Sequence, residues 1–192
     1  MKFIRTEIPD VILIEPKVHG DDRGYFLETF RQDKLDEFLG YKIDFCQDNE
    51  SKSKKGVLRG LHYQLPPFAQ TKLVRVIQGG VLDVAVDIRE GSPTFGKYIA
   101  IELNSTNKRQ LLIPRGFAHG FIVLEDDTIF NYKVDNYYSP ENDRGIFFND
   151  MDLGIDWRLD SSELILSEKD KIQPLLKDTK DLFEYGINYY EQ

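Results

Sequence analysis

The feature that most limits how this chain folds is a series of short apolar segments separated by turn residues, between residues 57 and 134. Runs of about four to eight apolar or alternating residues predict β-strands, and helical spacing is scarce in this stretch. The predicted strands are residues 71–78, 81–88, 97–103, 110–113, 118–124 and 128–134. Short strands that follow one another without intervening helices indicate an antiparallel sandwich or barrel and favour a jelly roll.

Few helices are expected around these strands. Residues 33–39 place Leu35, Phe38 and Leu39 at helical spacing, and Gly40 is suited to end a helix there. Residues 178–185 are a second candidate, a terminal helix that would pack on the barrel. No linker or repeat divides the 192 residues. We therefore predict that residues 1–192 form one all-β domain with a few short peripheral helices.

The charge composition bears on the partners of the protein. The chain has 33 acidic and 25 basic residues, with a formal net charge of -8. Such a surface repels phosphates, which argues against a nucleic-acid partner and requires any phosphate contact to be local. The single cysteine, Cys46, cannot form an intrachain disulfide, and no apolar run resembles a signal peptide or approaches the roughly 20 residues of a membrane span. We expect a cytoplasmic protein without a membrane partner.

His62 lies in a predicted strand, residues 57–64. Strict alternation would place it on one face with Gly60 and Gln64, and would place Arg59 on the opposite face. Gly60 is expected to leave space beside the imidazole, through which a ligand could approach. From this segment alone, a packed core histidine and a functional histidine are equally favoured.

The other two histidines differ in setting. His119 follows Pro114 and Gly116 in a Pro-x-Gly-x-x-His arrangement, which delivers the histidine from a tight turn onto a strand and resembles the second cupin signature. Metal-binding cupins also carry a first signature with His-x-His and a downstream Glu, and neither follows His62. Three metal ligands would then require a recruited carboxylate, so we predict a barrel without metal. His19 precedes a turn-like stretch and is expected in an exposed loop.

Lys72 and Tyr132 are ambiguous when each is taken singly. Lys72 shares a predicted strand with Leu73, which faces the other way, and solvent-exposed lysines are common in such positions. Tyr132 lies in the last predicted strand, where a tyrosine usually packs its ring. Neither residue indicates chemistry alone.

Taken together and in order, several segments resemble the dTDP-4-dehydrorhamnose 3,5-epimerase family. These segments are residues 22–28, 47–49, 56–64, 83–87 and 114–121, together with Lys72 and Tyr132. The resemblance runs from about residue 11 to about residue 170. It implies a cupin jelly roll, a homodimer and an isomerase that needs no cofactor. It also implies inversion of C3 and C5 of dTDP-4-dehydro-6-deoxy-D-glucose, on the route to dTDP-L-rhamnose.

The resemblance further implies residue roles. His62 is similar to the general base, Asp170 to the carboxylate that orients it, Tyr132 to the acid on the opposite face, and Lys72 to the group that stabilises the enolate. The implied substrate contacts are Arg23, Phe26, Glu28, Gln47, Asp48, Asn49, Arg59, Lys72, His119, Tyr138, Asp143 and Lys169. The first three would be contributed by the partner subunit. Asp143 stands where the family commonly has Glu, which puts the base or sugar preference in question.

The chemistry itself requires these types of residue. The C4 carbonyl acidifies the hydrogens on C3 and C5, so a neutral imidazole can remove one if a cation meets the charge on O4. His62 alone would return the proton to the same face, so inversion needs a second group, such as Tyr132, across the ring. Arg23 and Arg59 can fork onto a pyrophosphate, and an aromatic such as Phe26 offers a face for the base.

Several alternatives remain at this point. The same pocket would serve a 3- or 5-epimerase, or an epimerase of another nucleotide-linked 4-keto sugar such as a GDP-heptose. A sugar 3,4-ketoisomerase would need its base and acid on a common face, which leaves Tyr132 unexplained. The remaining alternatives are a metal-dependent cupin dioxygenase and a non-catalytic sugar-binding cupin.

Overall fold

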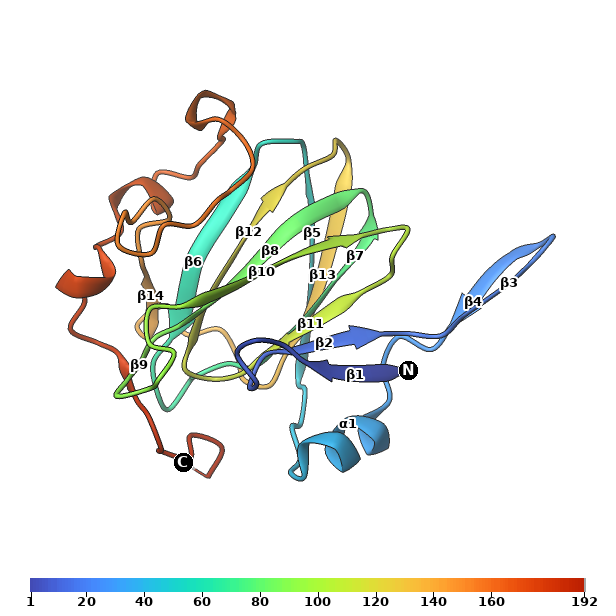
Figure 1. The fold of residues 1–192 in the computed structure, drawn as a ribbon, viewed down its shortest axis with the longest axis horizontal. Helices are drawn as coiled ribbons and strands as arrows, with labels where there is room; N and C mark the ends of the chain where they lie inside the picture. The colour runs from blue at the N-terminus through green and yellow to red at the C-terminus, as the bar shows by residue number, and fades with distance from the viewer. Residues whose placement is uncertain (192) are drawn as a thin grey trace.

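Two antiparallel sheets face each other in the computed structural model, which describes residues 1–191 (Figure 1). The first sheet contains, in spatial order, β1 (Lys2–Arg5), β2 (Ile12–Glu15), β11 (Gln110–Ile113), β7 (Lys72–Gln78), β13 (Thr128–Val134) and β5 (Gln47–Ser53). The second contains β10 (Tyr98–Asn104), β8 (Gly80–Asp87), β12 (Phe117–Val123), β6 (Leu58–Gln64) and β14 (Asp143–Gly145). The predicted jelly roll is confirmed, and the six predicted strands fall within one residue of the observed bounds.

The strand β8 shows how alternation builds a core on each face of the second sheet. Val81 and Ala85 pack between the two sheets, whereas Leu82, Val84 and Val86 pack on the outer face. All eight residues of β8 are buried, because protein covers both of its faces. The inner positions of this strand therefore point into the barrel, where the site lies.

Helix α1 (Gln32–Leu39) confirms the predicted helix. Leu35 is buried against Ile12 and Leu112 on the outer face of the first sheet. Gly40 ends the helix in the left-handed conformation, with φ of 81°, and its N–H donates to the carbonyl of Asp36. No helix in residues 1–191 has both the length and the apolarity to cross a bilayer.

The predicted terminal helix over residues 178–185 is wrong. After the short 3₁₀ turns η1 (Ser161–Glu163), η2 (Asp170–Ile172) and η3 (Leu176–Asp178), the chain extends into β15 (Phe183–Glu184), which pairs in parallel with β9 (Arg89–Glu90). Phe183 is 2% exposed and packs near the Tyr63 ring. Burial of this aromatic ring favours the extended backbone over the local helical tendency.

A hairpin formed by β3 (Val18–Asp21) and β4 (Gly24–Leu27) projects away from the barrel (Figure 1). Every residue of the hairpin except Leu27 is exposed, and Phe26 is 72% exposed. His19 is exposed as predicted, but it lies in strand β3 and not in a loop, because it pairs with Phe26.

Candidate active site

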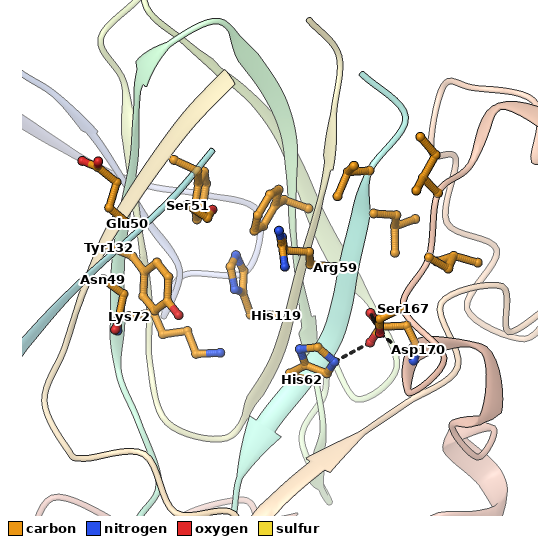
Figure 2. Close-up of a pocket in the computed structure, with 16 residues that line it drawn as sticks. Asn49, Glu50, Ser51, Arg59, His62, Lys72, His119, Tyr132, Ser167 and Asp170 are labelled. Carbon is orange, nitrogen blue, oxygen red and sulfur yellow. Dashed lines mark hydrogen bonds and ion pairs between the residues drawn. The ribbon is translucent and has the colours of Figure 1, made fainter. Parts of the chain in front are cut away.

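The space between the two sheets holds a cavity of about 600 Å³ (Figure 2). Strands β5, β6, β7, β12 and β13 and the segment after β14 contribute its walls. A second cavity of about 420 Å³ adjoins the first, and both are lined by Asn49, His62, Lys72 and Tyr132. These four residues therefore lie where the two cavities meet.

A register shift in β6 decides what this strand presents to the cavity. His62 is opposite His119 on β12, yet Arg59 is opposite Phe121, so β6 holds one extra residue between the paired positions. The bulge places Arg59 and His62 on the same cavity wall, and the predicted assignment of Arg59 to the opposite face is wrong.

Gly60 allows this bulge, and the role predicted for it is also wrong. Its φ is +123°, and a Cβ atom would lie 2.5 Å from Gly120 Cα and 2.7 Å from the carbonyl oxygen of His119. The backbone of β12 thus fills the space beside Gly60. Glycine serves the close approach of two strands there, and the ligand space lies on the inner face of His62.

His62 and Asp170 form a close pair. The Nε2 atom of His62 lies 2.5 Å from Oδ1 of Asp170, and Ser167 Oγ donates to Oδ2 over 2.7 Å (Figure 2). Asp170 is 2% exposed, and burial raises its pKa, but the bonds from His62 and Ser167 outweigh burial and bring the pKa below its usual range. With Asp170 ionised, Nε2 carries the proton, and the other nitrogen, which faces the cavity, is left as an acceptor.

Lys72 is the first residue of β7, and its ammonium group points toward His62 (Figure 2). Desolvation lowers the pKa of Lys72 to about 8, although the charges of Asp143 and Asp83 oppose this shift. The ammonium group thus keeps its charge at neutral pH although it is largely withdrawn from solvent.

Tyr132 lies on β13, in the sheet opposite His62, and the two side chains face each other across the cavity with Lys72 between them (Figure 2). Burial raises the pKa of Tyr132, which the charge of Arg59 only partly offsets. The phenol therefore keeps its proton at neutral pH.

A second imidazole–carboxylate pair lies behind the first. His119 Nε2 is 3.0 Å from Oδ2 of Asp83, and both side chains are buried. Burial lowers the pKa of His119, against the charge of Asp83. Neither Asp83 nor Ser167 had a predicted role. The sequence does hold a signal for Asp83, because it is a charged residue in the middle of a strand whose nearest neighbours, residues 81, 82 and 84–86, are all apolar.

The adjoining cavity brings together several of the predicted nucleotide contacts. Tyr138, Asp143 and Lys169 line it with Gln47. Lys169 forms an ion pair with Asp143, and the Tyr138 hydroxyl donates to Oδ2 of Asp143 over 3.1 Å. Asp143 is therefore held by two neighbours at the wall of this cavity.

Four of the predicted contacts do not line these cavities within one chain. Asp48 points to the outer face of its sheet and pairs with Lys133 over 2.9 Å. Arg23 and Phe26 lie on the projecting hairpin and Glu28 follows it, and the side chain of Arg23 is 89% exposed. Among residues 1–191, no three His, Cys, Asp or Glu side chains are grouped to hold a metal ion. That the reaction needs no metal stays a prediction.

Comparison with known proteins identifies the family. A family model described as dTDP-4-dehydrorhamnose 3,5-epimerase matches residues 5–178. The chain belongs to this family. It is therefore an isomerase of the epimerase type with a cupin-like jelly roll, as the sequence predicts. Family membership favours an epimerase over the ketoisomerase, dioxygenase and sugar-binding alternatives.

Individual relatives agree with this assignment. The dTDP-4-dehydrorhamnose 3,5-epimerase of Shigella flexneri is 56% identical over 88% of this chain and 93% of its own length. A dTDP-6-deoxy-D-glucose-3,5-epimerase from Legionella pneumophila, solved with dTDP-4-keto-L-rhamnose, matches with a TM-score of 0.92 and 48% identity over 97% of this chain and 99% of its own. A 3'-monoepimerase from Streptomyces bikiniensis, solved with dTDP-quinovose, has a TM-score of 0.90 at 31% identity, over 97% and 94% of the two chains.

Proposed function

We propose that this enzyme inverts C3 and C5 of dTDP-4-dehydro-6-deoxy-D-glucose, giving dTDP-4-dehydro-L-rhamnose for the biosynthesis of dTDP-L-rhamnose. The observation that carries the proposal is the placement of His62 and Tyr132 on facing sheets with Lys72 between them. A base on one side of a sugar ring and an acid on the other side are what inversion at carbon requires. The Legionella relative, bound to dTDP-4-keto-L-rhamnose, supports the choice of substrate.

His62 acts as the general base in this proposal. Its cavity-facing nitrogen takes the proton from C3 or from C5, and the resulting imidazolium is stabilised by ionised Asp170. Ser167 holds the second oxygen of Asp170 and so limits rotation of the carboxylate. The pair keeps the imidazole in one tautomer and one orientation.

Lys72 and His119 are placed to meet the negative charge that develops on O4 of the sugar. Lys72 supplies a full charge, and neutral His119 forms part of the wall behind it. Because the site is largely desolvated, a positioned cation there is worth more than the same cation in water.

Tyr132 returns a proton to the opposite face of the enolate. Its raised pKa keeps the phenol protonated until the enolate forms. The product configuration is set because His62 and Tyr132 lie on different sides of the ring.

The nucleotide end is proposed to occupy the adjoining cavity, beside Tyr138, Asp143 and Lys169. Arg59 lies on the same wall as His62 and is placed to contact the pyrophosphate. Asp143 is already bonded to Lys169 and Tyr138, so the shorter carboxylate is held by neighbours on this wall and does not need the reach of a Glu.

We further propose a homodimer in which Arg23, Phe26 and Glu28 of the hairpin complete the partner's site. The exposed hairpin supports this, since it contacts so little of its own chain. Mixing an Arg23→Ala enzyme with a His62→Asn enzyme tests it by subunit complementation. Mixed dimers should regain one intact site and hence activity, whereas no recovery would indicate that Arg23 serves its own subunit.

The remaining expectations are part of the same proposal. The reaction needs no cofactor, because imidazole, ammonium and phenol suffice for proton transfer next to a carbonyl. A cytoplasmic location is supported by the exposed free thiol of Cys46, which suits a reducing compartment. A single domain is supported by packing of the C-terminal segment against the barrel.

The proposal is tested by incubation with dTDP-4-dehydro-6-deoxy-D-glucose in D₂O. Deuterium should enter at both C3 and C5. Label at one carbon only would indicate a monoepimerase, the activity named for the Streptomyces relative. Label at neither carbon, with exchange into a GDP-linked or other 4-keto sugar from a panel, would contradict the proposed substrate.

A further inference from the structure

The C-terminal segment, residues 181–190, packs against the outside of the barrel on strands that carry the site. It runs past β14 and β9 along the outer side of the second sheet (Figure 1). The segment lies after residue 178, where the match to the family model ends. The Tyr63 hydroxyl donates to the carbonyl of Asp181 over 2.7 Å, and Tyr63 is the neighbour of His62 on β6.

Tyr190 contacts the residue that precedes Lys72. Its hydroxyl shares a 2.9 Å hydrogen bond with Oγ1 of Thr71, the residue before Lys72. Thr71 has no exposed surface, and its N–H donates to Oδ1 of Asp135 over 2.6 Å. Thr71 is therefore held by its side chain from the C-terminal segment and by its backbone from the end of β13.

Arg115 joins the same network from the turn before β12. It donates through Nε to Oδ2 of Asp135 over 3.2 Å and through Nη1 to the carbonyl of Tyr189 over 2.5 Å. The guanidinium also lies over the Tyr190 ring, 5.0 Å from its centroid. One buried network thus joins the ends of the strands that carry Lys72, Tyr132 and His119.

We propose that Tyr190 is a positioning residue for the epimerase reaction, which acts through Thr71 to fix the start of β7 and the direction of the Lys72 side chain. Lys72 is the first residue of β7 and pairs with Ile113 and Val134 on either side, so the contacts of Thr71 decide how the chain enters the strand. Thr71 and Lys72 point to opposite faces, so an anchor outside the barrel orients a charge inside it.

Tyr190→Phe removes the hydroxyl and keeps the ring. The hydroxyl makes one short hydrogen bond, to Thr71, and the N–H of Arg115 reaches it only at 3.5 Å, where a hydrogen bond is weak. We expect kcat to fall roughly threefold to tenfold, about the value of one net hydrogen bond, with KM changed by less than about twofold. The alkaline limit of the pH–rate profile should move upward, because a looser Lys72 becomes better solvated. A change in folding stability alone would not move that limit.

Tyr189→Phe is the matched control, since the Tyr189 hydroxyl accepts from the N–H of Glu184 within the same segment. It should leave kcat and the pH limit unchanged. Thr71→Val should reproduce the loss of Tyr190→Phe, the double variant should lose no more than either single variant, and Thr71→Ser should restore activity. Thermal unfolding of each variant verifies that it is folded at the assay temperature.

Equal activities of the Tyr190→Phe and Tyr189→Phe enzymes, or additive losses in the double variant, would overturn the positioning role. The inference rests on the proposed function, so His62→Asn is assayed in parallel. An inactive His62→Asn enzyme with a fully active Tyr190→Phe enzyme contradicts the positioning role alone. A fully active His62→Asn enzyme contradicts the proposed site and the inference together.

Discussion

The structure contains two imidazole–carboxylate pairs, whose histidines lie on the neighbouring strands β6 and β12. The two pairs differ in how far they are exposed to the cavity. His62 and His119 are directly paired across the two strands. The His62 side chain is 30% exposed and its carboxylate comes from the η2 segment, 108 residues along the chain. The His119 side chain is 7% exposed and its carboxylate, Asp83, comes from the adjacent strand β8.

The difference shows how one chemical unit supports two different tasks. A base must reach its substrate and must have a free nitrogen, and His62 meets both conditions at the cavity surface. His119 is held by burial as a neutral group, which suits a fixed wall beside developing charge. Exposure and the origin of the carboxylate, and not residue type, separate the two pairs.

Replacing each histidine with Asn should give the largest difference between the two pairs. His62→Asn should lower kcat by about 10²- to 10⁴-fold, because proton abstraction loses its base. His119→Asn should cost no more than about tenfold, because it removes a neutral wall residue. Steady-state kinetics measure both. Losses of equal size would mean that the two pairs share the proton transfer.

Lys72 lies near both pairs, and its removal tests whether charge stabilisation is separate from proton transfer. Lys72→Met should lower kcat by about 10²- to 10³-fold, the usual cost of losing one group that stabilises an oxyanion. Lys52→Met is the control, since Lys52 is 63% exposed on β5 and pairs with Asp127. A nearly normal kcat of the Lys72→Met enzyme would indicate that His119, and not Lys72, stabilises the negative charge on O4.

Replacing Asp170 and replacing Asp83 should have different effects, one on kcat and the other on stability. Asp170→Asn should lower kcat by roughly 10- to 100-fold, because His62 loses the partner that orients it. Asp83→Asn should mainly lower the free energy of unfolding, by about 1–3 kcal/mol, because a buried amide N–H₂ is left without a partner. Kinetics and urea denaturation of both variants measure the difference. A larger loss of kcat in Asp83→Asn than in Asp170→Asn would contradict the different tasks assigned to the two pairs.

Near pH 8, the change of activity with pH should be the smallest of these effects. Lys72 must be protonated to stabilise the enolate, and burial lowers its pKa to about 8. Activity should therefore fall above about pH 8, by about tenfold for each further pH unit. The alkaline limit of kcat/KM should persist in the His119→Asn enzyme and vanish in Lys72→Met. Loss of the alkaline limit in the His119→Asn enzyme would indicate that the titrating group belongs to the His119–Asp83 pair.

Much of the barrel could be predicted from the sequence, because alternation and glycine turns act locally. The strand predicted over residues 128–134, for example, has the same bounds as β13, and Phe130 and Tyr132 on it line the cavity. The face of Arg59 could not be predicted, since the bulge at Gly60 depends on how closely β12 approaches. The extended segment around Phe183 depends likewise on a distant partner, Tyr63.

The site was predictable to a similar degree. The ordered motifs predict four catalytic residues, and the fold places all of them around one cavity: His62, Lys72, Tyr132 and Asp170. The pairing of Asp83 with His119 could not be predicted, because two strands must be aligned before a carboxylate and an imidazole can be matched. Asp48 shows the reverse case, since a residue within a matching motif points away from the cavity.

The central claim, that His62 removes the proton and Tyr132 returns it from the other side, is tested most directly by isotope exchange in two variants. Tyr132→Phe and His62→Asn are incubated with substrate in D₂O, and deuterium and configuration at C3 and C5 are read by NMR. We predict that Tyr132→Phe exchanges these hydrogens but yields little inverted product, whereas His62→Asn exchanges none. Normal turnover to inverted product by Tyr132→Phe would contradict the claim.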